Sequence, residues 1–427
     1  MKTLTIHRRE LPRYLSWYLI LLPLFSGIFL DLLGLPGALR YTGDLAWCTL
    51  AVLAVGKGRL RLGRDLTVPA CLAAVFFLYT LAVILFRYQS GIWYLWGLRN
   101  NFRFYIAFFA FACLLSREDA QHCFRALEVL FWINIVLSLV QFFCLGIRQD
   151  YLGGIFGVER GRNGTYTLLF FLLMLSRSLL AMMNGAERMG PCLAKCGAAL
   201  LVAALAEMFG FFLLFSLTVM LAAVLTRFSR RKCLLLLVLG VVLLLSSNLL
   251  LRLFGEGSKL TLDVIRNRLF APHYATDDDL GRLTAIPTLA RTILQEPHQR
   301  LFGLGLGNCD TSTVAAFCSD FARQYAHLHY TWFLSAFLFL ETGYTGLFLY
   351  LLFFVVCLVQ AAKRKKRGGD LLYCQMGMIL PVLCMILTVY NSALRAEGGY
   401  LMYFGLALPF LRPSGKEADD EGKSGSS

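Results

Sequence analysis

The sequence has 427 residues, of which 58% are apolar and only 16% are charged, and this balance excludes an ordinary soluble domain. Its net charge of +15 lies in short Lys and Arg clusters between apolar runs, a pattern that indicates membrane topology rather than a nucleic-acid surface. The 13 cysteines form no Cys-x-x-Cys pair and lie mostly inside apolar runs, which favours small buried apolar residues over a zinc or redox motif.

The N-terminal segment has basic residues from Lys2 to Arg13, followed by an apolar run from Trp17. No small-residue cleavage site follows, and many more apolar runs do, so we interpret it as an uncleaved signal anchor. Each run of about twenty residues is long enough to cross a bilayer as a helix. Helices are expected because backbone polar groups in lipid must be satisfied within their own segment.

The predicted fold is all-α, a polytopic bundle of twelve crossings with both termini in the cytoplasm. The predicted crossings are 15–35, 42–56, 66–86, 103–116, 126–146, 165–183, 192–208, 210–226, 233–251, 343–362, 371–391 and 397–412. Three regions of the chain follow: nine crossings in 1–251, a long extracytoplasmic loop in 252–342, and three crossings in 343–412. The end, 413–427, is polar and is predicted to be a disordered cytoplasmic tail.

The distribution of Lys and Arg supports this orientation, because cytoplasmic loops carry an excess of both. Loops assigned to the inside contain Lys57, Arg59, Arg61, Arg64, Arg227, Arg230, Arg231, Lys232 and the run from Lys363 to Arg367. Short loops assigned to the outside hold isolated arginines such as Arg40, Arg148 and Arg395.

Residues 192–226 are almost unbroken in apolarity, yet both flanks are basic and predicted to be cytoplasmic. The segment must therefore turn back on itself, and Glu207, close to Gly210, is the polar break at which it turns. Glu207 is a catalytic candidate because an acid at membrane depth is costly to keep. The alternative is that Glu207 only marks an interfacial turn.

The long loop concentrates the remaining polar residues. Thr284 as N-cap and Pro287 at an early position predict a helix to about Leu294. Arg282 precedes this helix and Arg291 lies on it, and arginine suits a phosphate because its planar fork binds paired oxygens and keeps its charge. The alternative is that such arginines meet water or lipid headgroups.

Other features of the loop are less specific. Gly303, Gly305 and Gly307 alternate, which permits a tight turn or close backbone approach without matching a nucleotide-binding pattern. Residues 277–279 are all Asp and contain the spacing of a metal-binding Asp-x-Asp motif, but a charge run in a loop is usually solvated, and we predict no metal site. Cys309 and Cys318 could pair if the loop is oxidised.

Residues 328–362 need only one crossing, because their flanks belong on opposite sides. His329 to Leu340 is therefore predicted as a separate re-entrant or interfacial helix, ended by a turn at 341–343. His327 and His329 would point in different directions on a helix, so one of them at most could face a given site. A histidine beside an outward cavity could act as a general base, although a lone histidine is more often structural.

Several short motifs occur in a familiar order: GIFGVERGRNGT, ALAEMFGFF, Gly281-Arg282, LFGLGLGN, HLHYTW and LETGYTGL. In this order they resemble the O-antigen ligase and O-antigen polymerase superfamily, whose members are integral membrane glycosyltransferases with a long outer loop. The resemblance implies a fold like that of the class C glycosyltransferases and a location in a bacterial cell membrane. Its sharpest part covers residues 281–346.

The resemblance implies transfer of a glycan from a polyprenyl-diphosphate carrier to an acceptor sugar hydroxyl, without a metal ion or cofactor. Other polysaccharide-assembly proteins are implied partners, as is the bilayer, and nucleic acid is not. The predicted catalytic residues are Arg282, His329, Glu207 and His327, and the predicted substrate-binding residues are Arg291, Arg160, Arg162 and Arg323.

A polymerase of lipid-linked repeat units is favoured over a ligase, because the Ser-Arg pair typical of ligases is found only at Ser229-Arg230, in a loop assigned to the cytoplasm. Tyr330 stands where many relatives have Asn after the histidine, so the choice between His327 and His329 stays open. A lipid-linked oligosaccharide flippase and a membrane scaffold without chemistry are the alternatives from other classes.

Overall fold

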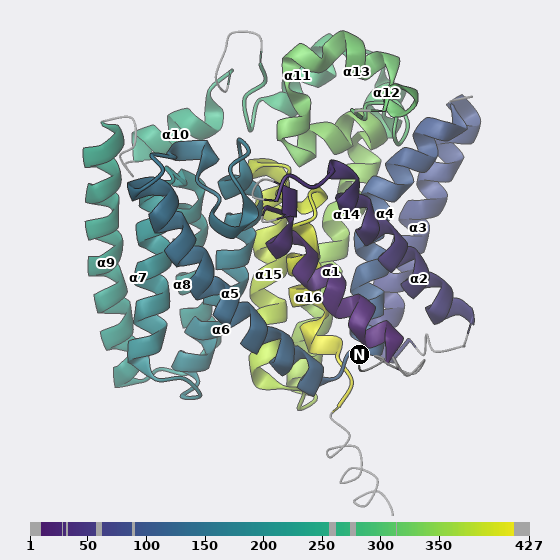
Figure 1. Cartoon of the computed structure of the whole chain (residues 1–427). Coiled ribbons are helices and arrows are strands. Elements are labelled where there is room, and N and C mark those ends of the chain that lie inside the picture. The colour runs from purple at the N-terminus through teal and green to yellow at the C-terminus, as the bar shows by residue number, and fades with distance from the viewer. Residues whose placement is uncertain are drawn as a thin grey trace, which may run out of the picture.

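In the computed structural model, the long apolar runs of the sequence form helices. The structure describes residues 10–27, 29–30, 33–56, 62–87, 90–255, 262–273, 279–312 and 314–413. Within these ranges the regular elements are all helical, with a single backbone bridge between Ser116 and Arg412 and no strand. The all-α class predicted from composition is therefore confirmed. Figure 1 shows the helices as a bundle with a smaller helical layer above one end.

The first nine helices, in chain order, are α1 (Leu11–Gly27), α2 (Thr42–Gly56), α3 (Arg64–Arg87), α4 (Gly91–Leu114), α5 (Arg117–Phe143), α6 (Leu168–Met183), α7 (Met189–Leu205), α8 (Phe209–Leu225) and α9 (Arg230–Phe254). The remaining helices are α10 (Leu262–Phe270), α11 (Ala285–Thr292), α12 (Pro297–Phe302), α13 (Asp320–Tyr325), α14 (Leu334–Lys366), α15 (Leu371–Tyr390) and α16 (Gly399–Ala407). Short 3-10 and π turns join several of them.

Six helical segments are long and apolar enough to cross a membrane: Arg64–Phe86, Arg117–Phe143, Asn163–Met183, Arg230–Leu253, Leu334–Lys366 and Leu371–Tyr390. The membrane character predicted from the sequence is thus supported by length and composition. A helix also lies at each of the other predicted crossings, but these helices are shorter or, like α4, less apolar because polar residues interrupt them. The count of twelve crossings stays a prediction.

Several predicted boundaries differ from the structure; α5, for example, begins at Arg117 rather than at 126. The first run is described as helix α1 to Gly27 and as helical again at 29–30, while 28, 31 and 32 of the predicted crossing to residue 35 lie outside the described residues. Helix α4 begins at Gly91, twelve residues before the predicted start at 103. The start was predicted too late because the polar residues from Arg99 to Arg103 interrupt the apolar run, although they lie on the helix.

Helix α6 is the centre of the bundle and α9 is at its edge. In the segment Asn163–Met183, 94% of the most apolar stretch is buried, against 22% for Arg230–Leu253. The central helix packs against α5, α7, α8, α15 and α16. It is apolar except at Ser176, Arg177 and Ser178, as expected for a helix that meets protein on most sides.

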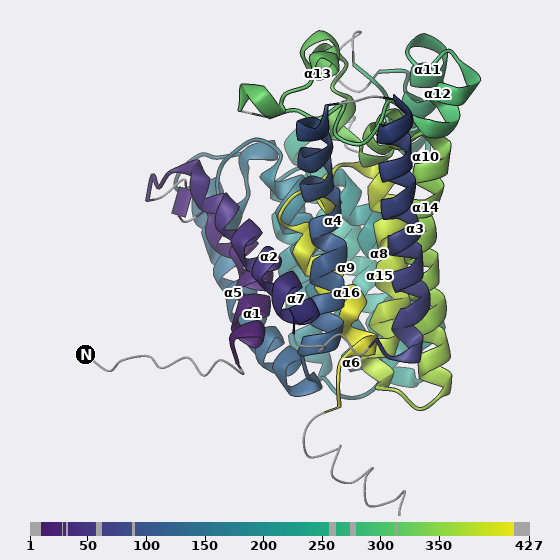
Figure 2. The ribbon, with the colours of Figure 1, turned by 90° about the vertical axis from the view of Figure 1, so that its right-hand side faces the viewer.

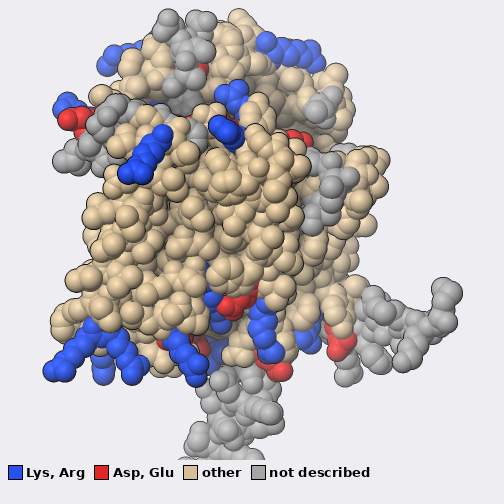
Figure 3. Space-filling model, turned by 60° about the vertical axis from the view of Figure 1, so that its left-hand side comes forward, with Lys and Arg blue, Asp and Glu red and all other residues tan. Residues whose placement is uncertain are grey.

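Basic residues gather at one end of the bundle, which we call the basic end. Arg364 and Arg367, at the end of α14, pair with Asp65 at the start of α3 at 3.5 and 2.6 Å. Lys365 donates to the carbonyl of Leu225, at the end of α8 (3.4 Å). Figure 3 shows Lys and Arg side chains along this lower edge, below a broad band with few charges.

Both ends of the described chain lie at the basic end (Figures 1 and 2). Arg13, in α1, contacts Asp119 at 2.6 Å in the first turn of α5. The amide of Arg117 donates to the carbonyl of Arg412 (3.1 Å), close to where the described chain ends.

Residues 279–333, with α11, α12 and α13, lie over the opposite end of the bundle and are called the cap (Figure 1). The helix predicted from Thr284 and Pro287 is confirmed as α11, Ala285–Thr292. The hydroxyl of Thr284 does not cap it but donates to the carbonyl of Ala271 (3.0 Å) and so ties the cap to the segment before it.

Close backbone approach explains two of the alternating glycines. Gly303 (φ 72°) lies against the backbone of Glu341 in α14, and Gly307 (φ 84°) lies against the carbonyl of Trp93 in α4. A Cβ at either position would collide with main-chain atoms, and L side chains rarely adopt such φ values. The glycines therefore let the cap rest directly on two helices of the bundle.

Helix α14 is broken at Gly343, whose φ of 65° and ψ of −169° are not helical. The break falls in the turn that the sequence predicted at 341–343, and it separates Leu334–Thr342 from the longer apolar part. The backbone of Leu301, in the cap, fits against Gly343.

Candidate functional site

The site predicted from the sequence is best described from the end of α15, where Tyr390 and Asn391 form what we call the Tyr390 junction. Arg282 packs its guanidinium over the ring of Tyr390, 4.5 Å from the ring centroid, and its Nε donates to the Tyr390 carbonyl at 3.3 Å. The same guanidinium lies 6.0 Å from the ring centroid of Phe333. Stacking on the rings of Tyr390 and Phe333 holds the Arg282 guanidinium in place.

His329 lies on the segment that adjoins Arg282. The amide of Leu280 donates to the carbonyl of Leu328 (3.3 Å), and the amide of Leu334 donates to that of Asn391 (3.2 Å), so the chain on both sides of His329 is fixed to its surroundings. The imidazole stacks on Trp332 at 4.1 Å between ring centroids. Its Nδ1 is buried without a hydrogen-bond partner, which is unusual for a ring nitrogen.

The backbone of His329 is left-handed (φ 49°, ψ 29°), and His327 belongs to the 3-10 turn Ala326–Leu328. The two histidines are therefore not on one continuous helix. His327 is exposed and its ring lies 6.3 Å from that of Tyr325, whereas His329 is half-buried. A non-glycine residue in this conformation costs about 1–3 kcal/mol and is most often kept where the surroundings demand it.

Glu207 approaches the same junction from the turn between α7 and α8, as the sequence predicted for its place in the chain. Its φ is 52°, and Gln149 Nε2 donates to its carboxylate at 3.2 Å. Gly210, three residues on, lies against the Tyr390 ring so closely that a Cβ would overlap it. The turn that carries Glu207 is thereby pressed onto the residue that holds Arg282.

Arg162 reaches the junction through the turn that precedes α6. Asn391 Nδ2 donates to the Gly164 carbonyl (2.9 Å), and Asn163 Nδ2 donates to the Ala206 carbonyl (2.9 Å), beside Glu207. The Arg162 side chain is 4% exposed, pairs with Glu159 and has one terminal nitrogen that is buried without a hydrogen-bond partner. Arg282 contacts the junction directly, whereas His329, Glu207 and Arg162 lie on segments whose neighbouring residues Leu334, Gly210 and Gly164 contact it.

The other predicted residues lie away from it. Arg291 is exposed on α11, and Arg323 is exposed on α13, 3.3 Å from Asp320. Arg160 is also exposed, at 69%, and lies 3.7 Å from Asp150. Exposed charges of this kind are well solvated, so their role in binding a substrate rests on the sequence alone.

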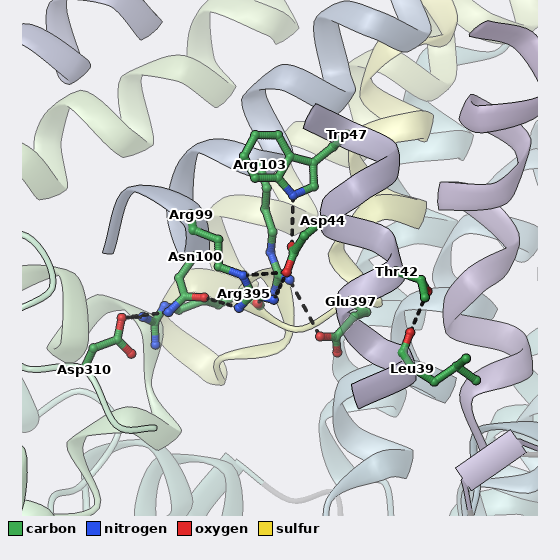
Figure 4. Close-up of polar contacts among 10 residues, drawn as sticks. All are labelled: Leu39, Thr42, Asp44, Trp47, Arg99, Asn100, Arg103, Asp310, Arg395 and Glu397. Atoms are coloured by element: carbon green, nitrogen blue, oxygen red, sulfur yellow. Dashed lines mark hydrogen bonds and ion pairs between the residues drawn. The ribbon is translucent and has the colours of Figure 1, made fainter. Parts of the chain in front are cut away.

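The site also includes a band of buried charged groups that sequence reasoning missed (Figure 4). Asp44 in α2 accepts from Trp47 (3.0 Å) and pairs with Arg99 in α4 (2.7 Å). Arg99 donates to Asn100 Oδ1 at 2.6 Å, and Asn100 Nδ2 donates to Asp310 in the cap at 2.8 Å. These groups join α2, α4 and the cap in one connected network.

The band continues into the connection between α15 and α16. Arg395 lies 2.5 Å from Asp310, and Arg103 donates to the Arg395 carbonyl at 2.8 Å. Arg103 also lies 3.7 Å from Glu397, which accepts from Tyr166 at 2.5 Å. Tyr166 in turn lies under the guanidinium of Arg162, 5.1 Å from the ring centroid, so the band and the Tyr390 junction are continuous.

The arginines of this band have unused donors. The Nε atoms of Arg103 and Arg395 are buried and make no hydrogen bond. The whole Arg103 side chain is only 5% exposed, so water does not supply the missing partner. Nearby carboxylates, Glu397 for Arg103 and Asp310 for Arg395, balance the charges of these arginines without accepting from their Nε groups.

Glu341 fixes the cap to the bundle beside this band. Its Oε1 accepts from the amides of Gly307 (2.9 Å) and Cys309 (3.3 Å), and its side chain is fully buried. Successive backbone N–H groups turned toward one oxygen form a small anion-binding nest, which here holds a carboxylate of the protein itself.

Cys309 and Cys318 are both free thiols. Burial, with the nearby Glu341 and Asp310 carboxylates, raises the pKa of Cys309 well above its ordinary value, so it stays protonated near neutral pH. Of the three aspartates considered for a metal, 277 and 278 lie outside the described residues. Asp279 is buried, and its backbone carbonyl accepts a hydrogen bond from His273 Nδ1 at 2.8 Å.

One signal in the sequence could have located the band. Arg99, Asn100 and Arg103 stand within about one turn on a helix that is otherwise apolar, and polar groups at membrane depth are costly unless they pair.

No protein-family model matches the sequence, and no curated protein matches it. The resemblance to O-antigen polymerases and ligases therefore rests on the sequence motifs alone.

Proposed function

We propose that this protein is a metal-independent membrane glycosyltransferase, a polymerase that joins lipid-linked oligosaccharide repeat units in surface polysaccharide synthesis. The observation that carries the proposal is that Arg282 and the segments carrying His329, Glu207 and Arg162 meet at the Tyr390 junction. These residues belong to motifs that are far apart in the sequence, and the proximity of their segments supports the proposal.

The proposed orientation places the basic end in the cytoplasm and the cap outside. Cytoplasmic loops are enriched in Lys and Arg, and both ends of the described chain lie at the basic end. The Tyr390 junction is then at the outer membrane face of a bacterial cell. A carrier lipid could reach it there with its tail in the bilayer and its glycan in the aqueous phase.

The proposed reaction is a substitution at the anomeric carbon of the donor glycan. The acceptor hydroxyl forms the new bond to this carbon, the bond to the carrier diphosphate breaks, and the hydroxyl proton passes to His329 or Glu207. Arg282 and Arg162 would stabilise the charge that develops on the departing diphosphate. The substrates are a polyprenyl-diphosphate glycan and an acceptor glycan.

A reconstituted system tests this proposal directly. The purified protein in liposomes, given undecaprenyl-diphosphate oligosaccharide, should release carrier diphosphate and form longer glycans. Arg282→Lys should lower the rate about 10²-fold, because lysine retains the charge and loses the planar fork. His329→Asn should lower it by about 10²-fold or more, since asparagine tolerates the left-handed backbone but is no base.

Matched controls lie outside the predicted site. Arg266→Lys on α10 and His298→Asn on α12 change exposed residues of the same two types and should leave the rate within about twofold, as exposed surface changes do. Equal losses in test and control variants would refute the site. Movement of intact lipid-linked glycan across the bilayer, with no chain growth and no diphosphate released, would favour a flippase instead.

A further inference from the structure

Two residues, one in the connection after α5 and one in the turn between α7 and α8, share an unusual backbone conformation. Among the non-glycine residues that the structure describes, only Gln149 (φ 54°), Glu207 (φ 52°) and His329 (φ 49°) have positive φ angles. Gln149 and Glu207 also contact each other, because Gln149 Nε2 donates to the Glu207 carboxylate at 3.2 Å. Such conformations are unfavourable for residues with side chains and are concentrated at functional sites, where the surroundings impose them.

Asn163 holds this pair together. Its Nδ2 donates to the carbonyl of Gln149 (3.2 Å) and to that of Ala206 (2.9 Å), which directly precedes Glu207. Its Oδ1 accepts from the amide of Gly164 (2.6 Å), and the residue is 3% exposed. One buried side-chain amide therefore fixes the connection after α5 against the turn between α7 and α8.

The two side chains of the pair offer complementary polar groups to a ligand. Gln149 is exposed and Glu207 is half-buried. The Gln149 amide has two N–H groups, of which one is used by Glu207, and an oxygen that accepts, whereas a carboxylate only accepts. Each hydroxyl of a sugar both donates and accepts, so an amide beside a carboxylate suits two neighbouring hydroxyls.

The charges that flank the pair along the chain have partners of their own. The Arg148 guanidinium lies over the ring of Phe142, 5.5 Å from the centroid, and Asp150 lies 3.7 Å from Arg160. A ligand of the pair therefore meets the Glu207 carboxylate at close range. This carboxylate repels an anion and accepts from a neutral hydroxyl.

Charge thus separates the two substrates of a glycosyl transfer. A carrier diphosphate is anionic and suits arginines, and Arg162 directly precedes the residue that holds the pair, while Arg282 stacks on Tyr390. The hydroxyls of an acceptor sugar are neutral and suit Gln149 and Glu207.

We propose that Gln149 and Glu207 form the subsite for the acceptor sugar, in which the Glu207 carboxylate accepts from one hydroxyl and the Gln149 amide binds its neighbour. Gln149 also orients the carboxylate. This inference rests on the proposed glycosyltransferase function and deepens it, since it assigns the acceptor to this pair and leaves the diphosphate to the arginines.

Binding of a free sugar tests the subsite without any transfer reaction. The probe is the oligosaccharide repeat unit released from the surface polysaccharide of the cell that makes this protein. It is titrated against the full-length protein in nanodiscs and followed by saturation-transfer NMR. Glu207→Gln should weaken binding about tenfold, because a hydrogen bond to a charged group becomes one to a neutral oxygen. Gln149→Asn should weaken it several-fold, since asparagine tolerates the left-handed backbone but its shorter side chain draws the amide away from Glu207.

Matched controls lie at the basic end of the bundle. Glu118→Gln and Gln121→Asn change exposed residues of the same two types at the start of α5 and should leave sugar binding unchanged. In a separate titration, undecaprenyl diphosphate should bind all four variants within about twofold of the unsubstituted protein, which shows that they are folded.

The outcomes separate the subsite from the reaction. Equal sugar binding by Gln149→Asn, Glu207→Gln and the two controls would overturn the subsite and leave the proposed reaction standing. Loss of both sugar and undecaprenyl diphosphate in Glu207→Gln and Gln149→Asn would show that the pair shapes the junction instead of binding the acceptor, and would also overturn it. An unsubstituted protein that binds neither ligand and extends no glycan would refute the proposed function itself, and the subsite with it.

Discussion

The carboxylate of Asp310 in the cap lies 2.5 Å from a terminal nitrogen of Arg395, on the connection between α15 and α16, with side chains 2% and 16% exposed. This is a buried ion pair between two layers of the molecule. Its attraction is offset by the loss of hydration, so its main effect is on the cost of breaking it.

Asp310→Ala should destabilise the protein by about 3–5 kcal/mol, because it leaves the Arg395 charge buried and unpaired. The free energy of unfolding in a detergent titration measures this. Asp320→Ala removes the acid of the exposed pair with Arg323, whose side chains are 80% and 57% exposed, and should cost about 1 kcal/mol or less. A loss that is equally small in both variants would mean that the pair does not hold the cap in place.

Glycine should be required at position 307 for stability, both because of its positive φ and because a side chain there would collide with α4. Gly307→Ala places a Cβ against the Trp93 carbonyl, whereas Gly161→Ala, at a similar φ of 81°, meets nothing within 4 Å. Both substitutions should lower the free energy of unfolding by about 1 kcal/mol, because alanine is unfavourable in a left-handed conformation. Only Gly307→Ala should lower it further, because its Cβ forces the backbone to shift. Equal unfolding free energies for the two variants would show that the cap yields freely at this contact.

Much of the architecture could be predicted because the bilayer imposes simple rules on sequence. The length of each apolar run predicted a helix. The basic flanks of residues 192–226 predicted the turn at Glu207, which the structure places between α7 and α8. Thr284 and Pro287 located α11, although the Thr284 hydroxyl bonds to Ala271 rather than to its own helix. Such local signals carry their information within a few residues.

The buried charged band could not be predicted in the same way, because its partners are far apart in the chain. Asp44, Arg99 and Asp310 each look like an ordinary loop or helix-end charge, and only the packing of α2, α4 and the cap brings them together. Glu341 was taken as part of a turn, whereas it is the acceptor that orders the glycine segment of the cap. Long-range pairing of this kind has no periodic pattern in the sequence.

Glu341 should matter through its acceptor oxygen rather than its charge. Glu341→Leu leaves the amides of Gly307 and Cys309 buried without an acceptor, at about 1–3 kcal/mol each. Glu341→Gln keeps an oxygen in the same place and should therefore retain most of the stability. Unfolding free energies of the two variants separate these effects, and a glutamine variant as unstable as the leucine variant would show that the negative charge itself is needed.

The two cap cysteines should differ sharply in reactivity, and the same measurement reports topology. Single-cysteine variants that retain Cys318 or Cys309 are treated, in intact cells, with a membrane-impermeant maleimide. Cys318 is partly exposed and should be labelled near neutral pH if the cap is outside. Cys309 is buried and its pKa is raised by burial and by two carboxylates, so the reactive thiolate is scarce until the pH rises well above the ordinary thiol pKa. Its labelling should stay low at pH 7 and pH 8, and rise only when the protein is unfolded. Rapid labelling of Cys309 in the folded protein would contradict the packed cap, and protection of Cys318 in intact cells but not in lysed cells would place the cap in the cytoplasm.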